Sequence, residues 1–182
     1  MRNYPTNKIA YNHIDETWSI DLADFSDYKI SNKGFRYIFI IIDNYSKYLW
    51  AIPLKNKNSQ TITNEYSNIL TTSKRSPLKL ESDRGKEWYN SIFQKFLKVK
   101  NIQHYSRYTD EGPSIAERVI RTVRNLLKKP KFLAGNADWL SELPSAIKTY
   151  NNTIHSSTKM TPIQASKKIN EKLVYSNLQD KR

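Results

Sequence analysis

Three hydrophobic, strand-like runs follow one another closely in the first third of the chain. They cover residues 16–25, 35–43 and 48–54, and two short stretches rich in Asn, Lys, Gly and Ser separate them. Closely spaced strands joined by such turns typically form an antiparallel meander. The sequence therefore predicts a sheet in which the first three strands are antiparallel.

Helical and strand-like patterns alternate after this meander. Helices are expected at residues 59–72, 88–100, 114–129, 138–154 and 161–169, with one short strand ending at Asp83 and another, containing His104, at 101–105. A meander, then alternating helix and strand, then helices is typical of an α/β layer fold. We expect a mixed five-stranded sheet flanked by helices.

Composition fits one globular domain of ordinary size. The 182 residues are 38% hydrophobic and 26% charged, which favours a folded core over disorder. The longest apolar run, from Tyr37 to Ile42, suits a buried strand and is far too short to span a membrane. The chain has no cysteine, and its three histidines are widely scattered. Disulfides and thiolate metal sites are thereby excluded, and a zinc motif is not indicated.

The chain carries a large positive charge. Its 30 Lys and Arg residues outnumber 17 Asp and Glu residues, which gives a formal net charge of +13. A charge of this size points to a polyanionic partner. Nucleic acid is favoured over an acidic membrane surface, because no expected helix pairs a basic face with an exposed apolar one.

Three acidic residues stand in contexts that suit metal binding. Asp21 lies inside the first strand-like run, Asp83 ends a later one just before a turn, and Glu117 lies one turn into a basic helix. Carboxylates that converge repel each other, and a divalent cation relieves that repulsion. A metal held beside a basic surface suggests phosphoryl-transfer chemistry on nucleic acid.

Each of these acids also has a purely structural interpretation. Glu117 stands three residues after Ser114, which is the spacing of a helix capping box. Asp83 precedes Arg84-Gly85 and is typical of a residue that begins a turn. Asp21 can be a strand acid that faces solvent. Together they favour a site, because one sheet can bring all three elements together.

The expected helix at 114–129 is strongly two-sided. One narrow stripe carries Glu117, Arg121, Arg124 and Lys128, and the opposite side carries Ile115, Val119, Val123 and Leu126. Six basic residues and no acid occur from Arg118 to Lys131. The apolar side is expected to pack on the sheet, and the other side could present a carboxylate while gripping phosphates.

Five motifs, in order, resemble the retroviral-type integrase core over residues 1–170. They are Trp18-Ser19-Ile20-Asp21-Leu22, Ile41-Ile42-Asp43-Asn44-Tyr45-Ser46-Lys47-Tyr48, Ser82-Asp83-Arg84-Gly85-Lys86-Glu87-Trp88, Ile115-Ala116-Glu117-Arg118-Val119-Ile120-Arg121-Thr122, and Tyr150-Asn151-Asn152 through His155 to Thr161-Pro162. Three further segments are similar to integrases of Maverick/Polinton transposons and their viral relatives: Arg2-Asn3-Tyr4-Pro5, His104-Tyr105-Ser106 and Asn151-Asn152-Thr153-Ile154-His155-Ser156-Ser157. The resemblance implies an RNase H-like fold with Asp21, Asp83 and Glu117 as its catalytic, metal-binding triad.

The resemblance also implies a chemistry. Such enzymes are two-metal polynucleotidyl transferases that process DNA 3′ ends and join element DNA to target DNA, using two Mg²⁺ or Mn²⁺ ions. Basic residues after the catalytic Glu hold the DNA end. The DNA-binding candidates here are Arg84, Arg118, Arg121, Arg124, Lys128 and Lys129. One departure is the acidic loop before Glu117, where Asp110 and Glu111 could compete as metal ligands.

The remaining expectations concern organisation and context. Residues 1–14 are interpreted as a lead-in, 15–170 as the catalytic core and 171–182 as a C-terminal tail. We expect a homodimer or higher multimer that acts on DNA, with no membrane or small-molecule partner, in the nucleus of a host cell or in a virus or element particle, and not secreted. Two alternatives stay open: a metal-dependent RNase H-like nuclease or resolvase, and a non-catalytic DNA-binding scaffold.

Overall fold

The computed structural model describes residues 11–106, 114–127 and 138–179. Its strands are β1 (Thr17–Asp24), β2 (Tyr37–Asp43), β3 (Leu49–Leu54), β4 (Lys79–Ser82) and β5 (Gln103–Ser106). Its α-helices are α1 (Ser59–Ser73), α2 (Ser91–Val99), α3 (Ile115–Leu127), α4 (Trp139–Asn152), α5 (Pro162–Ala165) and α6 (Glu171–Gln179), with short 3₁₀ turns at Ser26–Tyr28 and Lys168–Asn170.

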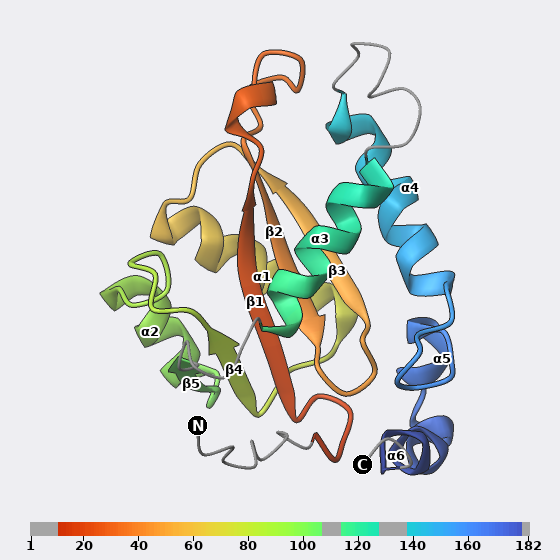
Figure 1. Cartoon of the computed structure of the whole chain (residues 1–182). Coiled ribbons are helices and arrows are strands. Elements are labelled where there is room, and N and C mark those ends of the chain that lie inside the picture. Colours follow the sequence, from red (N-terminus) through yellow and green to blue (C-terminus); the bar gives the residue numbers. More distant parts are fainter. Residues whose placement is uncertain (1–10, 107–113, 128–137, 180–182) are drawn as a thin grey trace, which may run out of the picture.

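The five strands form one mixed sheet in the order β3-β2-β1-β4-β5 (Figure 1). The first three strands are antiparallel, as the meander predicts, whereas β4 pairs parallel to β1 and β5 pairs parallel to β4. The sequence prediction of a mixed five-stranded sheet is confirmed. The order also places β4 directly beside β1, although β2, β3 and α1 lie between them in the chain.

Helices cover both faces of the sheet, and each face has its own hydrophobic core (Figure 1). Ile38, Ile40 and Ile42 pack with α3 and α4. Phe39 and Ile41, which alternate with them along β2, pack with α1 and α2. A strand buried on both faces reads as a continuous apolar run, because successive side chains point to opposite sides. Among the described residues, no helix has the length and apolar character needed to cross a membrane.

A buried ion-pair network fixes the turn between β2 and β3. Asp43 is fully buried and accepts hydrogen bonds from the backbone N–H groups of Tyr45 (3.2 Å) and Ser46 (3.4 Å). Arg75, which follows α1, reaches the Asp43 carboxylate at 2.8 Å and the Asp15 carboxylate at 2.7 Å. Asp43 therefore stabilises this turn.

Replacing Arg75 by Met is expected to destabilise the fold by about 3 kcal/mol, because the Asp43 carboxylate would remain buried without its cation. Urea unfolding at neutral pH measures this change. Arg36→Met is the matched control, since Arg36 is exposed and its loss should change the free energy of unfolding by less than about 0.5 kcal/mol. An equal effect of the two substitutions would contradict the assigned role of Arg75.

Three element boundaries differ from the sequence predictions. The helix expected at 88–100 begins at Ser91, because the Asn90 side chain accepts a hydrogen bond from the Phe93 N–H and caps it. The helix expected at 161–169 ends at Ala165, and Lys167 is extended before a short 3₁₀ turn. Within the expected tail, Glu171–Gln179 form the helix α6. The predicted capping box of Thr161 and Gln164 is confirmed.

Candidate active site

The parallel pairing of β1 with β4 brings Asp21 and Asp83 to neighbouring positions. Ser19 pairs with Glu81, and the Ser19 Oγ donates a hydrogen bond to a Glu81 carboxylate oxygen at 3.3 Å. Side chains two residues further along a strand share the same face. Asp21 lies two residues beyond Ser19 in β1, so it belongs to the face of the sheet that α3 covers. Asp83 follows directly after the end of β4.

Glu117 lies in the first turn of α3, the helix that packs on β1 and β2. The predicted capping box is present: the Glu117 N–H donates to Ser114 Oγ at 3.0 Å, and the Ser114 N–H donates to Glu117 Oε2 at 3.2 Å. The apolar side of α3 carries Ile115, Val119, Val123 and Leu127, all buried. Leu126, expected on that side, is only partly buried, and Glu117, Arg121 and Arg124 on the opposite stripe are exposed.

The three carboxylates are close enough to influence one another electrostatically. The pKa of Asp21 is raised from 3.8 to about 6, first by burial and then by the negative charges of Asp83, Glu117 and Glu87. The hydrogen bond from the Leu22 N–H, 2.7 Å long, opposes this rise. Because Asp21 responds to both other predicted acids, the fold has brought β1, β4 and α3 together at one point.

The side chains are not gathered into a preformed metal cage. Within residues 11–106, 114–127 and 138–179, no three His, Cys, Asp or Glu side chains are grouped so that they could hold a metal ion. Asp83 Oδ1 accepts from the Gly85 N–H at 3.0 Å, and Glu117 accepts from the Ser114 N–H. Asp83 and Glu117 are thus each engaged with backbone N–H groups of their own segments.

The donor set nevertheless suits a hard divalent cation. Mg²⁺ prefers carboxylate oxygens and is commonly held by one or two carboxylates, with water and substrate phosphates completing its shell. Asp83 and Glu117 are exposed, so their side chains have room to turn, while Asp21 is partly buried in the middle of β1.

Glu87 is a fourth acid at this place, and the spacing of acids in the sequence does not single it out. Its charge contributes to the raised pKa of Asp21, after those of Asp83 and Glu117. A Cβ at Gly85 would lie 2.7 Å from the Glu87 carboxylate carbon and 3.0 Å from Asp83 Oδ1. The loop after β4 therefore packs Glu87 against Gly85, next to Asp83. Its position depends on that loop conformation, which residue spacing alone does not reveal.

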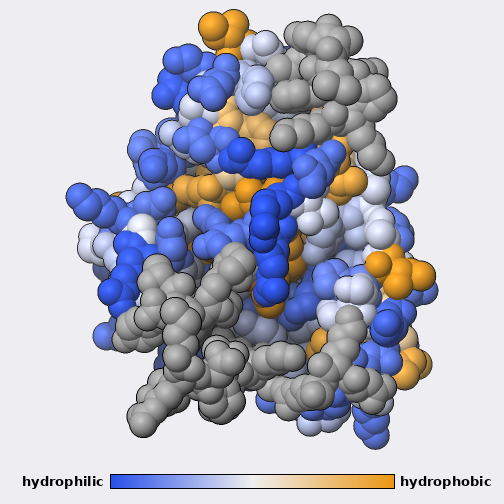
Figure 2. Space-filling model, in the orientation of Figure 1, coloured by the Kyte–Doolittle hydropathy of each residue, from blue (hydrophilic) through white to orange (hydrophobic). Residues whose placement is uncertain are grey.

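Exposed basic side chains of α3 continue from Glu117 across the same face. Arg118 and Arg121 are exposed, and Figure 2 shows strongly hydrophilic side chains in a band across the middle of the face that carries α3. Arg124 is also exposed, but it donates to the Asp24 carbonyl at 3.0 Å and lies over the Phe25 ring at 5.1 Å. Arg84 is exposed in the loop after Asp83. Lys128, Lys129, Asp110 and Glu111 lie outside the described residues.

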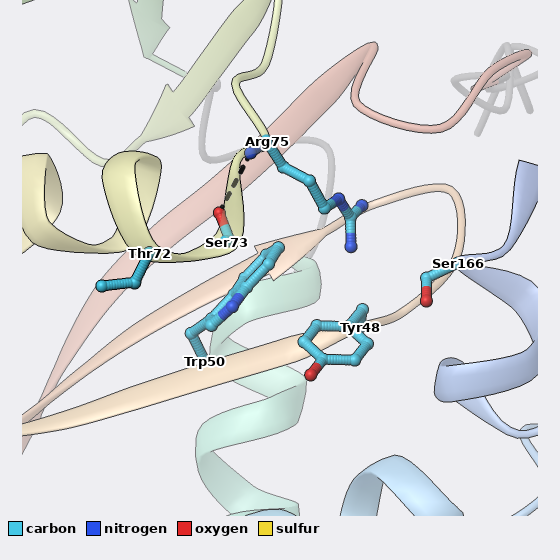
Figure 3. Close-up of a pocket in the computed structure, with 6 residues that line it drawn as sticks. All are labelled: Tyr48, Trp50, Thr72, Ser73, Arg75 and Ser166. Carbon is cyan, nitrogen blue, oxygen red and sulfur yellow. Dashed lines mark hydrogen bonds between the residues drawn. The ribbon is translucent and has the colours of Figure 1, made fainter.

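A separate pocket lies at the edge strand β3 (Figure 3). It measures about 390 Å³ and is lined by Tyr48, Trp50, Thr72, Ser73, Arg75 and Ser166. The Arg75 guanidinium lies over the rings of Trp50 (4.9 Å) and Tyr48 (5.5 Å). The half-buried Trp50 packs with the core on the α1 side of the sheet, so this pocket is separate from the acids.

Solved structures share this fold. The catalytic core domain of HTLV-2 integrase, solved with magnesium in a trimeric form, has a TM-score of 0.68 at 18% identity, over 85% of this chain and 98% of that one. An intasome of simian T-cell lymphotropic virus, solved with the PP2A subunit B56 gamma, has a TM-score of 0.69 at 19% identity, over 90% of this chain and 60% of that one. The RNase H-like fold of retroviral integrase cores is thereby confirmed.

Sequence relatives point the same way. The chain is 26% identical over 142 residues to an uncharacterised transposon-derived protein of Caenorhabditis elegans, covering 78% of this chain and 50% of the relative. It is 25% identical over 138 residues to the Pol polyprotein of a radiation murine leukemia virus, covering 75% of this chain and 23% of the polyprotein. The chain thus spans half or less of these relatives. The model of the integrase core domain matches residues 12–109, more than half of the sequence, and the chain therefore belongs to the integrase core domain family.

Proposed function

We propose that this chain is the catalytic core of a DNA integrase that processes the 3′ ends of element DNA and joins them to target DNA. One observation carries the proposal: in a chain of the integrase core family, Asp21, Asp83 and Glu117 come from three separate elements, and the charges of the other two raise the pKa of Asp21. A fold that holds like charges near one another, beside an excess of basic side chains, suits metal-assisted chemistry on a polyanion.

These residues fit the roles that the reaction requires. Asp21, Asp83 and Glu117 would hold two Mg²⁺ or Mn²⁺ ions, which supply Lewis-acid activation of the attacking and leaving oxygens when bound. The magnesium in the HTLV-2 integrase core supports this choice of metal. Arg118 and Arg121 would bind phosphates and hold the DNA end near the acids. Water is the nucleophile in end processing, and the freed 3′-hydroxyl is the nucleophile in strand transfer.

The proposal extends to assembly and context. HTLV-2 integrase cores occur in dimeric and trimeric forms, and the simian viral relative forms an intasome. We propose that this chain likewise acts on DNA as a dimer or larger multimer. We also propose that the chain is related to integrases of Maverick/Polinton elements and that its catalytic core spans residues 15–170. Its proposed location is a host nucleus or an element particle.

A branched DNA substrate tests the proposal without knowledge of the recognised end sequence. The branch mimics the product of strand transfer, and by microscopic reversibility the same site can reseal the target strand and release the element strand. The purified chain is expected to produce resealed strands only with Mg²⁺ or Mn²⁺ present. Cuts without resealing would favour the nuclease alternative, and tight binding with no reaction would favour the scaffold alternative.

The exposed basic residues of α3 lead to a separate prediction about the affinity for DNA. The logarithm of the DNA association constant should fall linearly with the logarithm of salt concentration, with a slope of about −0.9 per phosphate contact. Arg121→Ala should therefore flatten the slope by about 0.9, measured with a fluorescent duplex between about 50 and 200 mM salt. Lys98→Ala, exposed in the last turn of α2, is the control. Equal slopes for all three proteins would exclude Arg121 from the DNA contact.

A further inference from the structure

A chain of hydrogen bonds leads to Asp83 from the opposite face of the sheet. The Gln94 side-chain amide, on α2, lies 2.6 Å from His104 Nδ1 on β5. His104 Nε2 lies 2.9 Å from Ser82 Oγ, and Ser82 Oγ donates to the backbone carbonyl of Asp83 at 2.7 Å. In the β4–β5 ladder, His104 pairs with Leu80 and Ser82 pairs with Ser106. This Gln94–His104–Ser82 relay ends on a predicted metal ligand.

The relay has one consistent direction. The Gln94 amide nitrogen also donates to the Trp88 carbonyl at 2.9 Å, so its two hydrogens are both used. His104 Nδ1 must then accept, which leaves the ring proton on Nε2. That proton is donated to Ser82 Oγ, and the serine hydroxyl hydrogen goes to the Asp83 carbonyl. Each group therefore determines whether the next group in the relay donates or accepts their shared hydrogen bond.

Packing holds the imidazole ring in place. The His104 ring stacks on Tyr89, with centroids 4.7 Å apart and planes at 28°, and meets Phe93 edge-on at 6.3 Å. Burial lowers the pKa of His104 to about 4, so the ring is neutral over the ordinary range of pH. A neutral, stacked ring has a defined tautomer and orientation, which a relay of this kind requires.

Asp83 needs such support because of its place in the sheet. The β4–β5 ladder ends at the pair of Ser82 and Ser106, so Asp83 is the first residue beyond regular strand pairing. Its exposed side chain is held by the Gly85 N–H of its own turn. The Ser82 hydroxyl is itself held by His104, and its hydrogen bond to the Asp83 carbonyl restrains the backbone that carries the Asp83 carboxylate.

We propose that His104 is a positioning residue that acts through Ser82 to hold the backbone of Asp83, so that its carboxylate is presented beside Asp21 for metal capture. This inference rests on the proposed function, since it concerns the same metal site. Groups that orient metal ligands from behind commonly change metal affinity 10- to 100-fold when removed. A role confined to joining α2 to the sheet would instead change stability and leave metal affinity unaltered.

Three variants separate these roles. Ser82→Ala removes the last link, His104→Phe keeps an aromatic ring but removes both hydrogen bonds, and His104→Gln restores a donor near the position of Nε2. Phe96→Leu is the matched control, because Phe96 is a partly buried residue of α2 outside the relay. Thermal unfolding measures the stability of each variant, so that metal affinities can be compared between variants of similar stability.

Metal affinity is the deciding readout. Mn²⁺ titration, followed by thermal shift and by resealing of the branched DNA, should show that Ser82→Ala and His104→Phe require about ten times more Mn²⁺ for half-saturation. His104→Gln should recover part of the loss, and Phe96→Leu should match the wild type. Nitrogen chemical shifts of the His104 ring in the metal-free wild type should show the proton on Nε2.

The outcomes distinguish the two proposals. Wild-type metal dependence together with unaltered half-saturation in Ser82→Ala and His104→Phe would overturn the positioning role and leave the proposed function intact. A proton on Nδ1 would overturn the relay as drawn, whatever the activity. A wild type that neither binds Mn²⁺ nor reseals DNA would overturn the proposed function, and the positioning role with it.

Discussion

Glu117→Gln is expected to abolish metal-dependent DNA joining, with a loss of at least about 10³-fold, and to leave the fold intact. The Gln side chain keeps an oxygen that can accept from the Ser114 N–H, so the capping box of α3 survives. It loses the negative charge that a divalent cation requires. The change therefore separates the two roles that the sequence leaves open for this residue.

Rates on branched DNA and thermal unfolding together measure this result. Glu142→Gln makes the same chemical change in the first turn of α4 and should leave the joining rate unaltered. A normal rate in Glu117→Gln would mean that Glu117 only caps its helix. Glu87, whose charge also reaches Asp21, would then be the next acid to replace.

Local pattern was sufficient to predict most of the sheet and the faces of its helices. The β2 run is apolar throughout because both of its faces are covered, and this feature is visible in the sequence. The basic and apolar sides of α3 follow from the helical period in the same way. Both capping boxes were readable because their partners lie three residues apart.

The helix α6 could not be predicted because its support is distant in the chain. Its one fully buried side chain, Val174, packs in a small cluster with Tyr45. The Tyr45 hydroxyl donates to the Glu171 carbonyl at 2.6 Å, across 126 residues. The segment has few strong helix signals of its own, so tertiary packing decides its conformation.

The residues of the candidate site also differ in whether a local sequence pattern reveals them. Asp21, Asp83 and Glu117 stood out because each has a local context, and the fold places them within electrostatic reach of one another. Glu87 and His104 had no such local signal. The position of Glu87 against Gly85 depends on the conformation of the loop after β4, and the hydrogen bond of His104 to Gln94 depends on the packing of α2. Arg124, predicted only to bind DNA, also holds α3 to the end of β1 through the Asp24 carbonyl.

Asp21→Asn is expected to stop DNA joining to a similar extent and yet to make the metal-free protein more stable at neutral pH. The pKa of Asp21 rises from 3.8 in the unfolded chain to about 6 in the fold, first because of burial and then because of Asp83, Glu117 and Glu87. The charged form is therefore unfavourable in the native state. Removing that charge should yield about 1–3 kcal/mol after allowance for partial exposure.

The sign of the pH dependence follows from proton binding. Between pH 3.8 and about 6 the folded protein holds the Asp21 proton more tightly than the unfolded chain does. The free energy of unfolding of the wild type thus falls as pH rises through this window. The advantage of Asp21→Asn should be near zero at about pH 4 and complete above about pH 7. Asp24→Asn, at an exposed position on the same strand, is the matched control.

Metal should reverse this order of stability. Mn²⁺ that binds only the native state stabilises it by about 2.7 kcal/mol at 100 times its dissociation constant. The wild type should gain this amount and Asp21→Asn should gain far less, because its neutral amide is a poor ligand. Urea unfolding at pH 7.5, with Mn²⁺ and with a chelator, measures both effects. Equal stabilisation of the two proteins by Mn²⁺ would place the metal elsewhere, while a wild type more stable than Asp21→Asn in chelator would contradict the charge repulsion on which the site depends.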